Sequence, residues 1–254
     1  SVASRGRGDV YKRQGWNTEP RTDCRDVLET ALPASFCVDA GGRSSTLDRT
    51  VLRIGRESMT KTVEFLYDFG SPTVYLAATQ LPILADRAGA IIDWQPILLG
   101  GVFKSTGNQS PAFIAAKAAY MNDDLQRFAN RYGVPFNWNP HFPINTLALM
   151  RGAVAYQDDA VASSTYRDAI FTSIWVEERN LNAPNVIGQV LTAAGLDPAE
   201  LMERIGQQTV KDQLIDNTEQ AVNRGVFGAP TFFVGQQMFF GQDRLDFVAE
   251  ALSG

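Results

Sequence analysis

Cysteine and histidine are scarce in this chain of 254 residues. It has two cysteines, Cys24 and Cys37, and one histidine, His141. Residues 38–254 therefore contain neither a Cys-x-x-Cys redox pair nor a disulfide framework, and the spacing of the two cysteines fits no redox or metal motif. A multi-histidine metal site or a Ser-His-Asp triad would depend on a single imidazole. We therefore expect no bound metal.

Long apolar runs and clustered positive charge are also missing. No apolar stretch reaches the ~20 residues that a membrane-spanning helix needs, and residues 1–30 are charged and lack the apolar core of a secretory signal. The net charge of −5 argues against nucleic acid, because phosphate binding needs a concentrated basic surface. We expect a cytoplasmic protein without nucleic-acid or membrane partners.

Residues 1–58 differ in composition from the rest of the chain. They are rich in Arg, Asp, Ser, Gly and Thr, and only Arg25–Leu32 has the pattern of a short helix. The chain begins at Ser1, and Met59 lies just before the first convincing strand. We expect Met59 to be the natural start and the leader to be an upstream read-through, a cloning remnant or an incorrectly assigned reading frame. A genuine disordered extension is the alternative.

From Val63 onward the pattern predicts the order strand, helix, strand, several helices, strand, strand, helix. Val63–Phe69 and Ile91–Leu99 are apolar and rich in β-prone residues. Ser71-Pro72 gives a helix N-cap followed by proline at the first helical position. Pro82 is expected to kink or split the helix that follows.

Residues 110–207 have the pattern of helices only, and the C-terminal part returns to strands. We expect a helix from Tyr166 to Glu178, an amphipathic helix over Val210–Arg224, a hairpin formed by Pro230–Val234 and Met238–Phe240, and a closing helix over Asp243–Leu252. The result is a βαβ half and a ββα half that are separated by a helical segment.

Two short segments resemble the two halves of a thioredoxin-type active site. Ser71 stands where a redox member of that fold carries its first cysteine. Ala229-Pro230 precedes an apolar strand, where thioredoxin-like folds have a cis-proline that faces the helix start. With the element order, these segments favour an α/β, thioredoxin-like fold with a large all-helical insertion, the DsbA-like arrangement. We expect a thioredoxin-like domain of residues 63–104 and 208–254 and a helical insertion of residues 105–207.

A serine cannot form a disulfide, so we expect the site to act on a thiol that another molecule supplies. The start of a helix offers unpaired N–H groups and about half a positive charge, which stabilise an anion and lower the pKa of a thiol. The Ser71 hydroxyl would add a hydrogen bond to the sulfur. The plain alternative is that Ser71 is an ordinary N-cap.

Three further segments carry candidate ligand-binding side chains. Lys104 and Asn108 follow the second strand, at the strand end where parallel sheets bind ligands. Lys104 is a candidate partner for a carboxylate, and Asn108 for a peptide-like backbone; a Gly-rich loop with a solvated lysine is the alternative. Gln242 and Asp243 precede the last helix and are either ligand contacts or an ordinary cap. His141 lies among aromatic and proline residues that are candidates for lining an apolar substrate pocket.

Taken together, these motifs resemble the 2-hydroxychromene-2-carboxylate isomerase family, which is related to the kappa-class glutathione transferases. The resemblance runs from about Val63 to Leu252. It rests on Asp-Phe-Gly-Ser-Pro at 68–72, Leu-Leu-Gly-Gly-Val-Phe-Lys-Ser-Thr-Gly-Asn at 98–108, Phe-Gly-Ala-Pro-Thr at 227–231 and Phe-Gly-Gln-Asp-Arg at 240–244.

The resemblance implies a glutathione-dependent enzyme. Ser71 matches the serine that activates glutathione, and the other matched glutathione contacts are Asn108, Ala229 before the cis-proline Pro230, and the γ-glutamyl contacts Gln242 and Asp243. The implied reaction is reversible thiolate addition to an aromatic hydroxy-acid of the 2-hydroxychromene-2-carboxylate type. The substrate-side residues would be Lys104, Asn108 and His141. Two departures are Thr73, where an aromatic residue is frequent, and Gln242, where relatives have Asn or Ser.

Other functions stay open on the sequence. A kappa-type glutathione transferase or peroxidase would consume glutathione, whereas an isomerase would regenerate it. A non-catalytic thioredoxin-fold protein would hold a peptide or a small acid. The missing Cys-x-x-Cys pair argues against a thiol–disulfide oxidoreductase. The resemblance also suggests a homodimer that acts on a small aromatic carboxylate.

Overall fold

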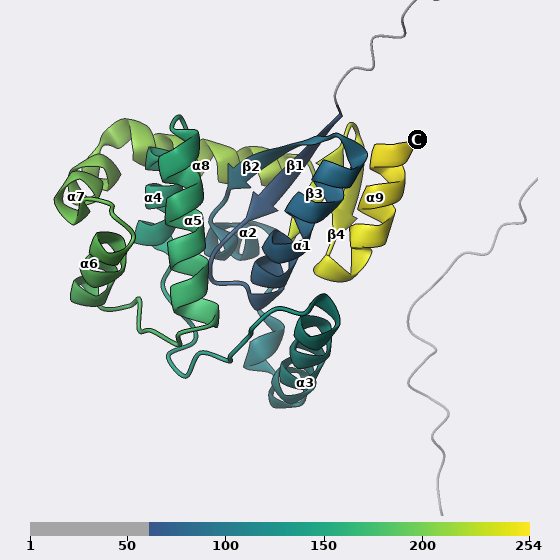
Figure 1. Ribbon diagram of the computed structural model, residues 1–254, viewed down its shortest axis with the longest axis horizontal. Coiled ribbons are helices and arrows are strands. Elements are labelled where there is room, and N and C mark those ends of the chain that lie inside the picture. The colour runs from purple at the N-terminus through teal and green to yellow at the C-terminus, as the bar shows by residue number, and fades with distance from the viewer. Residues whose placement is uncertain (1–60) are drawn as a thin grey trace, which may run out of the picture. The chain divides into compact units, whose positions relative to one another are not determined.

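The computed structural model describes residues 61–254 (Figure 1). The predictions for the leader, residues 1–58, and for a short helix at Arg25–Leu32 lie outside the described residues, as do both cysteines.

A four-stranded sheet in the order β2-β1-β3-β4 forms the centre of the fold. β1 (Thr62–Tyr67) pairs in parallel with β2 (Ile91–Pro96) and antiparallel with β3 (Thr231–Val234). β4 (Gln237–Phe240) is the antiparallel neighbour of β3. The second half of β1, Phe65–Tyr67, is buried on both faces of the sheet, and this explains its run of apolar residues. Glu64, in the first half, is half-buried and forms an ion pair with Arg224.

Helices make up most of the remainder. α1 (Pro72–Ala88) connects β1 to β2, and η2 (Gln242–Arg244) and α9 (Leu245–Ser253) follow β4. Between β2 and β3 lie α2 (Leu99–Thr106), η1 (Pro111–Phe113), α3 (Ala115–Tyr132), α4 (Leu147–Ala155), α5 (Ala160–Trp175), α6 (Pro184–Ala193), α7 (Pro198–Gly206) and α8 (Gln208–Asn223).

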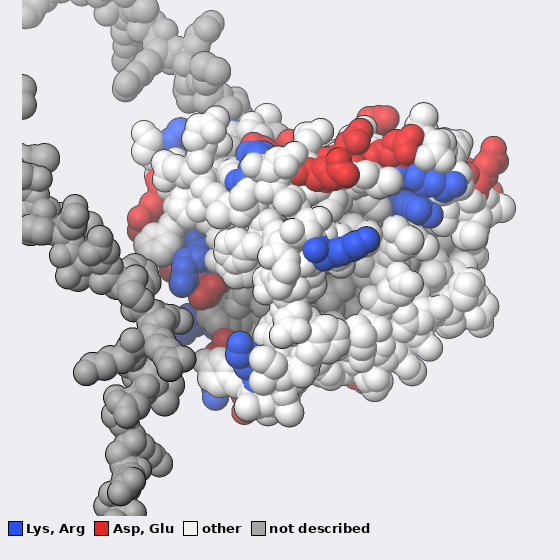
Figure 2. All heavy atoms as spheres, turned by 180° about the vertical axis from the view of Figure 1, so that it is seen from behind, with Lys and Arg blue, Asp and Glu red and all other residues white. Residues whose placement is uncertain are grey.

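The helices group on different sides of the sheet. α1 packs against α9 and α3, and α8 packs against α2 and α4. In Figure 1, α4–α7 gather on the side of the molecule where β2 lies, whereas α9 lies beside β4. On the face shown in Figure 2, acidic side chains gather along one edge, and the basic side chains stand singly or in small groups on a largely uncharged surface.

The predicted order of elements is confirmed, but several details differ. α1 is continuous through Pro82, so this proline does not split the helix. The alternative expectation, a kink, stays a prediction. Pro82 is exposed, and water can therefore solvate the carbonyl that loses its hydrogen bond. Part of the segment around Lys104 is the helix α2 and not a loop, and the predicted domain boundary after residue 104 falls inside that helix.

The start of α5 also differs from the prediction. α5 begins at Ala160 and not at Tyr166, because the Asp159 carboxylate accepts hydrogen bonds from the amides of Val161 and Ala162. An acidic N-cap of this kind stabilises a helix start even where no apolar stripe marks it in the sequence.

An aromatic cluster ties α5 to the end of β1. The Trp175 indole N–H donates to the Phe69 carbonyl oxygen at 2.9 Å, and both side chains are fully buried. The Phe69 ring lies 4.8 Å from that of Phe171 and 5.9 Å from that of Tyr166, both at steep angles. Such edge-to-face pairs are favourable arrangements for aromatic rings. The backbone just before Ser71 is therefore fixed by a helix that lies about a hundred residues further along the chain, as the separation of 106 residues shows.

A buried carboxyl group joins three elements at the same place. Asp68 is 1% exposed; its Oδ1 accepts from the Gly70 amide and its Oδ2 from the Leu99 amide, both at 2.8 Å. Burial raises the pKa of the Asp68 carboxyl, while the hydrogen bonds from Gly70 and Leu99 act in the opposite direction. The end of β1 thus holds the residue before Ser71 and the first residue of α2.

We expect Asp68→Asn to destabilise the fold at neutral pH by about 1–3 kcal/mol. The amide has one acceptor oxygen, so its NH₂ group would face a backbone N–H and leave a buried donor unpaired. Urea unfolding of the two proteins measures the difference. Asp123→Asn, at an exposed position on α3, is the control and should leave stability unchanged. An Asp68→Asn protein as stable as the wild type would contradict this role for the carboxylate.

The stability difference between wild type and Asp68→Asn should also depend on pH. Because the pKa of Asp68 is raised in the folded state, its contribution is fully present below the pKa of an unfolded Asp, about 4. That contribution is lost as the pH rises through the folded pKa. The difference should therefore be largest in acid and should narrow, toward neutral pH, to about 1–3 kcal/mol, which the two backbone hydrogen bonds account for.

Candidate active site

Ser71 caps the start of α1. Its backbone is extended, with φ −103° and ψ 118°, and its Oγ accepts from the Val74 amide at 3.4 Å. Pro72 follows at the first helical position, as predicted. Gly70 allows this turn, because a Cβ at that position would lie 3.1 Å from Cγ2 of Thr146 and 3.3 Å from the Asp68 carboxylate. The sequence Asp-Phe-Gly-Ser-Pro therefore places a hydroxyl at a helix start that has little space around it.

Two hydroxyls and one carbonyl meet at this helix start. Ser71 Oγ lies 2.8 Å from Thr73 Oγ1, and the two oxygens lie 3.2 and 3.4 Å from the Ala229 carbonyl oxygen. One hydroxyl can donate to the other, which then donates to Ala229. Ser71 is 6% exposed, so the group is nearly enclosed. A ligand anion that entered here would meet two O–H donors in addition to the helix amides.

The opposite side of the site is the loop before β3. The Ala229-Pro230 peptide bond is cis, as predicted, and a second cis bond, Phe142-Pro143, was not predicted. Gly228 lets the Phe240 ring lie close to this loop, because a Cβ there would lie 2.8 Å from the ring. The hydrogen bond from Ser71 to Ala229 joins positions that are 158 residues apart. The site therefore forms only when both halves of the sheet are assembled.

A cavity of about 180 Å³ opens beside these groups. We call it the Ser71 pocket. Its polar lining includes Ser71, Thr73, Asn108, Gln109 and Ser110, and much of its remaining lining is apolar. The apolar side chains are those of Leu99, Phe103, Met121, Phe142 and Phe240, together with Pro72, Pro111 and Ala229. A lining of this composition suits a ligand with an unsaturated or aromatic body and a few polar groups.

Asn108 lies at the pocket, as predicted. Its side-chain amide donates to the Phe227 carbonyl oxygen at 2.8 Å, and its Oδ1 accepts from the Gln109 amide at the same distance. Asn108 thus connects the chain after α2 to the loop that carries Ala229. Its side chain is exposed, so a ligand can reach it.

Lys104 and His141 do not line the Ser71 pocket. Leu99 and Phe103, four residues apart on α2, share the face toward Ser71. Lys104 follows Phe103 and is turned by about 100° around the helix, so it lines a different cavity against α4 and α8. His141 is exposed, and only its neighbour Phe142 lines the pocket. Whether Lys104 and His141 contact a substrate stays a prediction.

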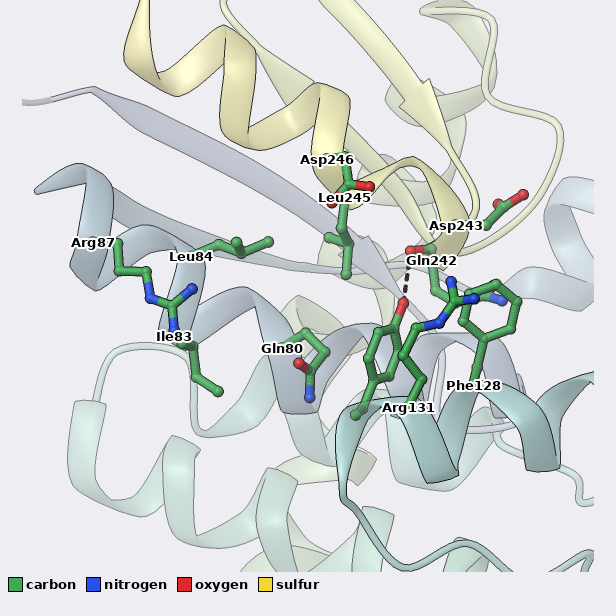
Figure 3. Close-up of a pocket in the computed structure, with 11 residues that line it drawn as sticks. Gln80, Ile83, Leu84, Arg87, Phe128, Arg131, Gln242, Asp243, Leu245 and Asp246 are labelled. Carbon is green, nitrogen blue, oxygen red and sulfur yellow. Dashed lines mark hydrogen bonds between the residues drawn. The ribbon is translucent and has the colours of Figure 1, made fainter.

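Gln242 and Asp243 line another cavity, of about 260 Å³, between α1, α3 and η2 (Figure 3). The Tyr132 hydroxyl donates to the Gln242 carbonyl oxygen at 3.3 Å, the interaction drawn in Figure 3. Arg87, Arg131 and Asp246 line the same cavity. Charges of both signs therefore surround it. Whether these residues contact a ligand at Ser71 stays a prediction.

Sequence reasoning assigned no role to several residues that line the Ser71 pocket. Phe103 and Met121 are examples, together with Phe240 at the end of β4. Phe103 lies four residues after Leu99, a spacing that places both on one face of a helix. This signal was missed because the segment was interpreted as a loop. Met121 lies on α3 and carried no distinguishing signal.

Two structural searches of residues 61–254 gave negative results. Within this range, no helix has the length and apolar character needed to cross a bilayer. The same residues include no group of three or more His, Cys, Asp or Glu side chains placed to hold a metal ion.

Comparisons with known proteins agree with this geometry. Residues 62–253 match the family of DSBA-like thioredoxin domains. A 2-hydroxychromene-2-carboxylate isomerase of Sphingobium xenophagum is 35% identical over 196 residues, 76% of this chain and 99% of that protein. Human glutathione S-transferase kappa 1 is 28% identical over 212 residues, 76% of this chain and 92% of that protein.

The structural comparison supports the same fold. A solved 2-hydroxychromene-2-carboxylate isomerase aligns with a TM-score of 0.69 and 29% identity, covering 75% of this chain and 94% of that one. The predicted α/β thioredoxin-like fold of the DsbA type, with helices inserted between the two halves of the sheet, is confirmed.

We expect Ser71→Ala to lower the free energy of unfolding by about 1 kcal/mol, because it removes the N-cap of α1. Asp159→Ala removes the N-cap of α5 and should cost a similar amount at a position outside the Ser71 pocket. Urea unfolding of both variants checks this. A loss well above 2 kcal/mol for Ser71→Ala alone would show that Ser71 does more for the fold than cap a helix.

Proposed function

The chain belongs to the DsbA-like thioredoxin family and, within it, to the 2-hydroxychromene-2-carboxylate isomerases, and we propose that it is a glutathione-dependent isomerase of an aromatic hydroxy-acid. Isomerase or glutathione-transferase activity is supported by the names of its relatives. The observation that carries the finer proposal is the placement of Ser71. Its hydroxyl lies at a helix start, opposite the residue before a cis-proline, in a largely apolar pocket.

The residues around Ser71 fit a thiol ligand. The hydroxyls of Ser71 and Thr73 have one carbonyl acceptor between them, so one O–H group can turn to a sulfur while the other stays on Ala229. Pro72 has no N–H and the Val74 amide donates to Ser71, so the Thr73 amide is the unpaired donor among the first three residues of α1. The positive end of the helix dipole acts in the same direction.

Asn108 would contact the peptide part of glutathione. Gln242 and Asp243 would hold its γ-glutamyl end. Because these two residues line a different cavity, glutathione would have to extend beyond the Ser71 pocket to reach them.

When bound, glutathione would supply a thiolate for reversible addition to a conjugated double bond, which allows a cis–trans change. The contribution of the chain is to keep that sulfur ionised. Each hydrogen bond to a thiolate favours the charged form and lowers the pKa of the thiol. Leu99, Phe103 and Phe240 supply an apolar surface against which an aromatic ring can pack and from which water is excluded.

The recognition of the substrate carboxylate differs from the prediction. Among the described residues that line the Ser71 pocket there is no Lys, Arg or His. The carboxylate would therefore be bound by neutral donors, of which Asn108, Gln109 and Ser110 are the nearest on the side of the pocket formed after α2. Neutral donors hold a carboxylate more weakly than a paired cation does and allow it to leave with the product.

A kappa-type glutathione transferase is the second candidate. It is favoured by the 28% identity to human glutathione S-transferase kappa 1, which covers 92% of that protein. The same helix start and the same two hydroxyls would serve it, because both reactions need a glutathione thiolate. Only the fate of glutathione separates the two functions.

We expect glutathione bound to the full chain to be ionised at neutral pH, and Ser71→Ala to reduce the ratio of thiolate to thiol by about tenfold or more. A hydrogen bond to a charged group is worth about 1.5–3 kcal/mol, and one pKa unit corresponds to 1.36 kcal/mol. Calorimetry measures glutathione binding, and the ultraviolet absorbance of the thiolate measures ionisation. Asp159→Ala is the control, since it loses a cap of the same kind but no group in the pocket.

The same protein can be tested for isomerase activity. We expect a hydroxychromene-carboxylate substrate to isomerise with catalytic glutathione while total free thiol stays constant. Stoichiometric loss of thiol would instead support the transferase. If glutathione does not bind at saturating concentration, the proposed function is wrong, whatever activity the protein has.

We expect Thr73→Val to lower the rate of the glutathione-dependent reaction by about fivefold, since one neutral hydrogen bond is worth about 1 kcal/mol. Valine has the shape of threonine without the hydroxyl, so the packing at the helix start is kept. Thr73→Ser restores the hydroxyl and should recover most of the rate. The pH at which the rate rises should also shift, to higher values in Thr73→Val and back in Thr73→Ser, because the lost hydrogen bond would raise the pKa of the bound thiol. Equal rates and profiles in wild type and Thr73→Val would exclude a role for the second hydroxyl.

A further inference from the structure

A second cavity lies on the other side of α2 from the Ser71 pocket. Its volume is about 400 Å³, and it is bounded by α2, α4 and α8. We call it the α2–α8 cavity. It shares no lining residue with the Ser71 pocket among the described residues. Its size is within the range of cavities that hold small organic ligands.

Basic side chains from three helices converge on this cavity. Lys104 comes from α2, Arg151 from α4 and Lys211 from α8, and Glu219 is the one carboxylate in the lining. Within residues 61–254, none of the three basic groups forms an ion pair. The chain has a net charge of −5, and on the face in Figure 2 its basic side chains stand singly or in small groups. Three of them around one cavity with one acid are therefore a local excess of positive charge.

Arg151 has an unmet hydrogen-bonding requirement. Its Nε is buried, and no described residue accepts a hydrogen bond from it. A buried donor without a partner costs free energy, and such groups in folded proteins usually have an explanation, such as a ligand or an ordered water. Because Nε has no exposed surface, a ligand in the cavity would meet the terminal guanidinium nitrogens of Arg151 and not Nε.

The rest of the lining is largely apolar. Leu98, Leu147, Leu214 and Ile215 surround the cavity, and Ile215 is 52% exposed. One side is fixed in place, because the Leu98 amide donates to the Thr218 hydroxyl at 3.0 Å and that hydroxyl donates to the Leu214 carbonyl at 2.7 Å. An apolar surface with cations around it is complementary to a ring that carries a carboxylate.

We propose that the α2–α8 cavity is a binding site for an aromatic carboxylate of one or two rings. The ring packs on the leucines and Ile215, and the carboxylate is held by Arg151, Lys104 and Lys211. The site is separate from the Ser71 pocket, and its existence does not depend on glutathione chemistry. Lys104 thus binds a carboxylate, as its position suggested, but in a different cavity from the one predicted.

Calorimetric titration of the full chain with 2-naphthoate tests this proposal. We expect binding that weakens with added salt, and the double variant Lys104→Met, Lys211→Met should weaken it at least about tenfold, which corresponds to 1.4 kcal/mol. Lys117→Met, which removes an exposed lysine from α3 outside both cavities, is the control and should bind like the wild type. Arg151→Met is the second test, and should weaken binding by a similar factor.

The uncharged analogue 2-naphthalenemethanol separates the ring from the charge. It should bind more weakly than 2-naphthoate to the wild type and equally to the wild type and the double variant. Thermal melting of each variant verifies that it is folded. Equal 2-naphthoate affinity in wild type and double variant would place the probe elsewhere and overturn the proposal, as would the absence of measurable binding. Neither result affects the glutathione experiments, because no residue is shared.

Discussion

The buried carboxyl group of Asp68 is the contact on which the candidate site depends. It accepts one hydrogen bond from the backbone just before Ser71 and one from the first amide of α2. The two helices that form the Ser71 pocket are thereby fixed to the end of the same strand. Burial favours the neutral form of this group, and two backbone donors favour the charged one. The hydrogen bonds define a geometry that a purely apolar contact would leave less well determined.

The inserted helices complete the site from the other side. Trp175 of α5 holds the Phe69 carbonyl, and Phe142 and Met121 come from the segment between α2 and α4. The loop with the cis-proline, which carries Ala229, belongs to the C-terminal half of the sheet. Contacts between such distant positions require long loops to close, which costs conformational entropy. The chemistry at Ser71 is therefore a property of the assembled fold and not of the helix start alone.

The sequence was most informative where the chemistry is local. The Ser71 N-cap and the order of strands and helices follow from neighbouring residues, and both were predicted. The cis bond at Ala229-Pro230 was predicted from the resemblance to thioredoxin-like folds. Side-chain directions were not predictable in the same way. The two glycines before Lys104 favoured a loop in the sequence interpretation. In the structure this segment is the helix α2, whose first amide donates to Asp68, and the direction of the Lys104 side chain is set by that helix.

Gln242 and Asp243 illustrate the same limit. Their positions after β4 were evident from the sequence, but their cavity is formed with residues of α1 and α3 that lie more than a hundred positions earlier, as the 110-residue separation of Tyr132 and Gln242 shows. A sequence motif shows which side chains are present and able to bind a ligand. The packing of the helices decides which groups meet, and a local pattern does not contain that information.

The distribution of charge around α2 suits the two anions that we propose as ligands, a thiolate and a carboxylate. The helix start at Ser71 can stabilise one negative charge, and a thiolate and a carboxylate would compete for it. A lysine in the same pocket would attract the carboxylate and raise that competition. The absence of Lys and Arg among the described residues lining the Ser71 pocket leaves the helix start to the sulfur. If both proposals hold, the cations across α2 would bind a carboxylate without competing with the glutathione thiolate at Ser71.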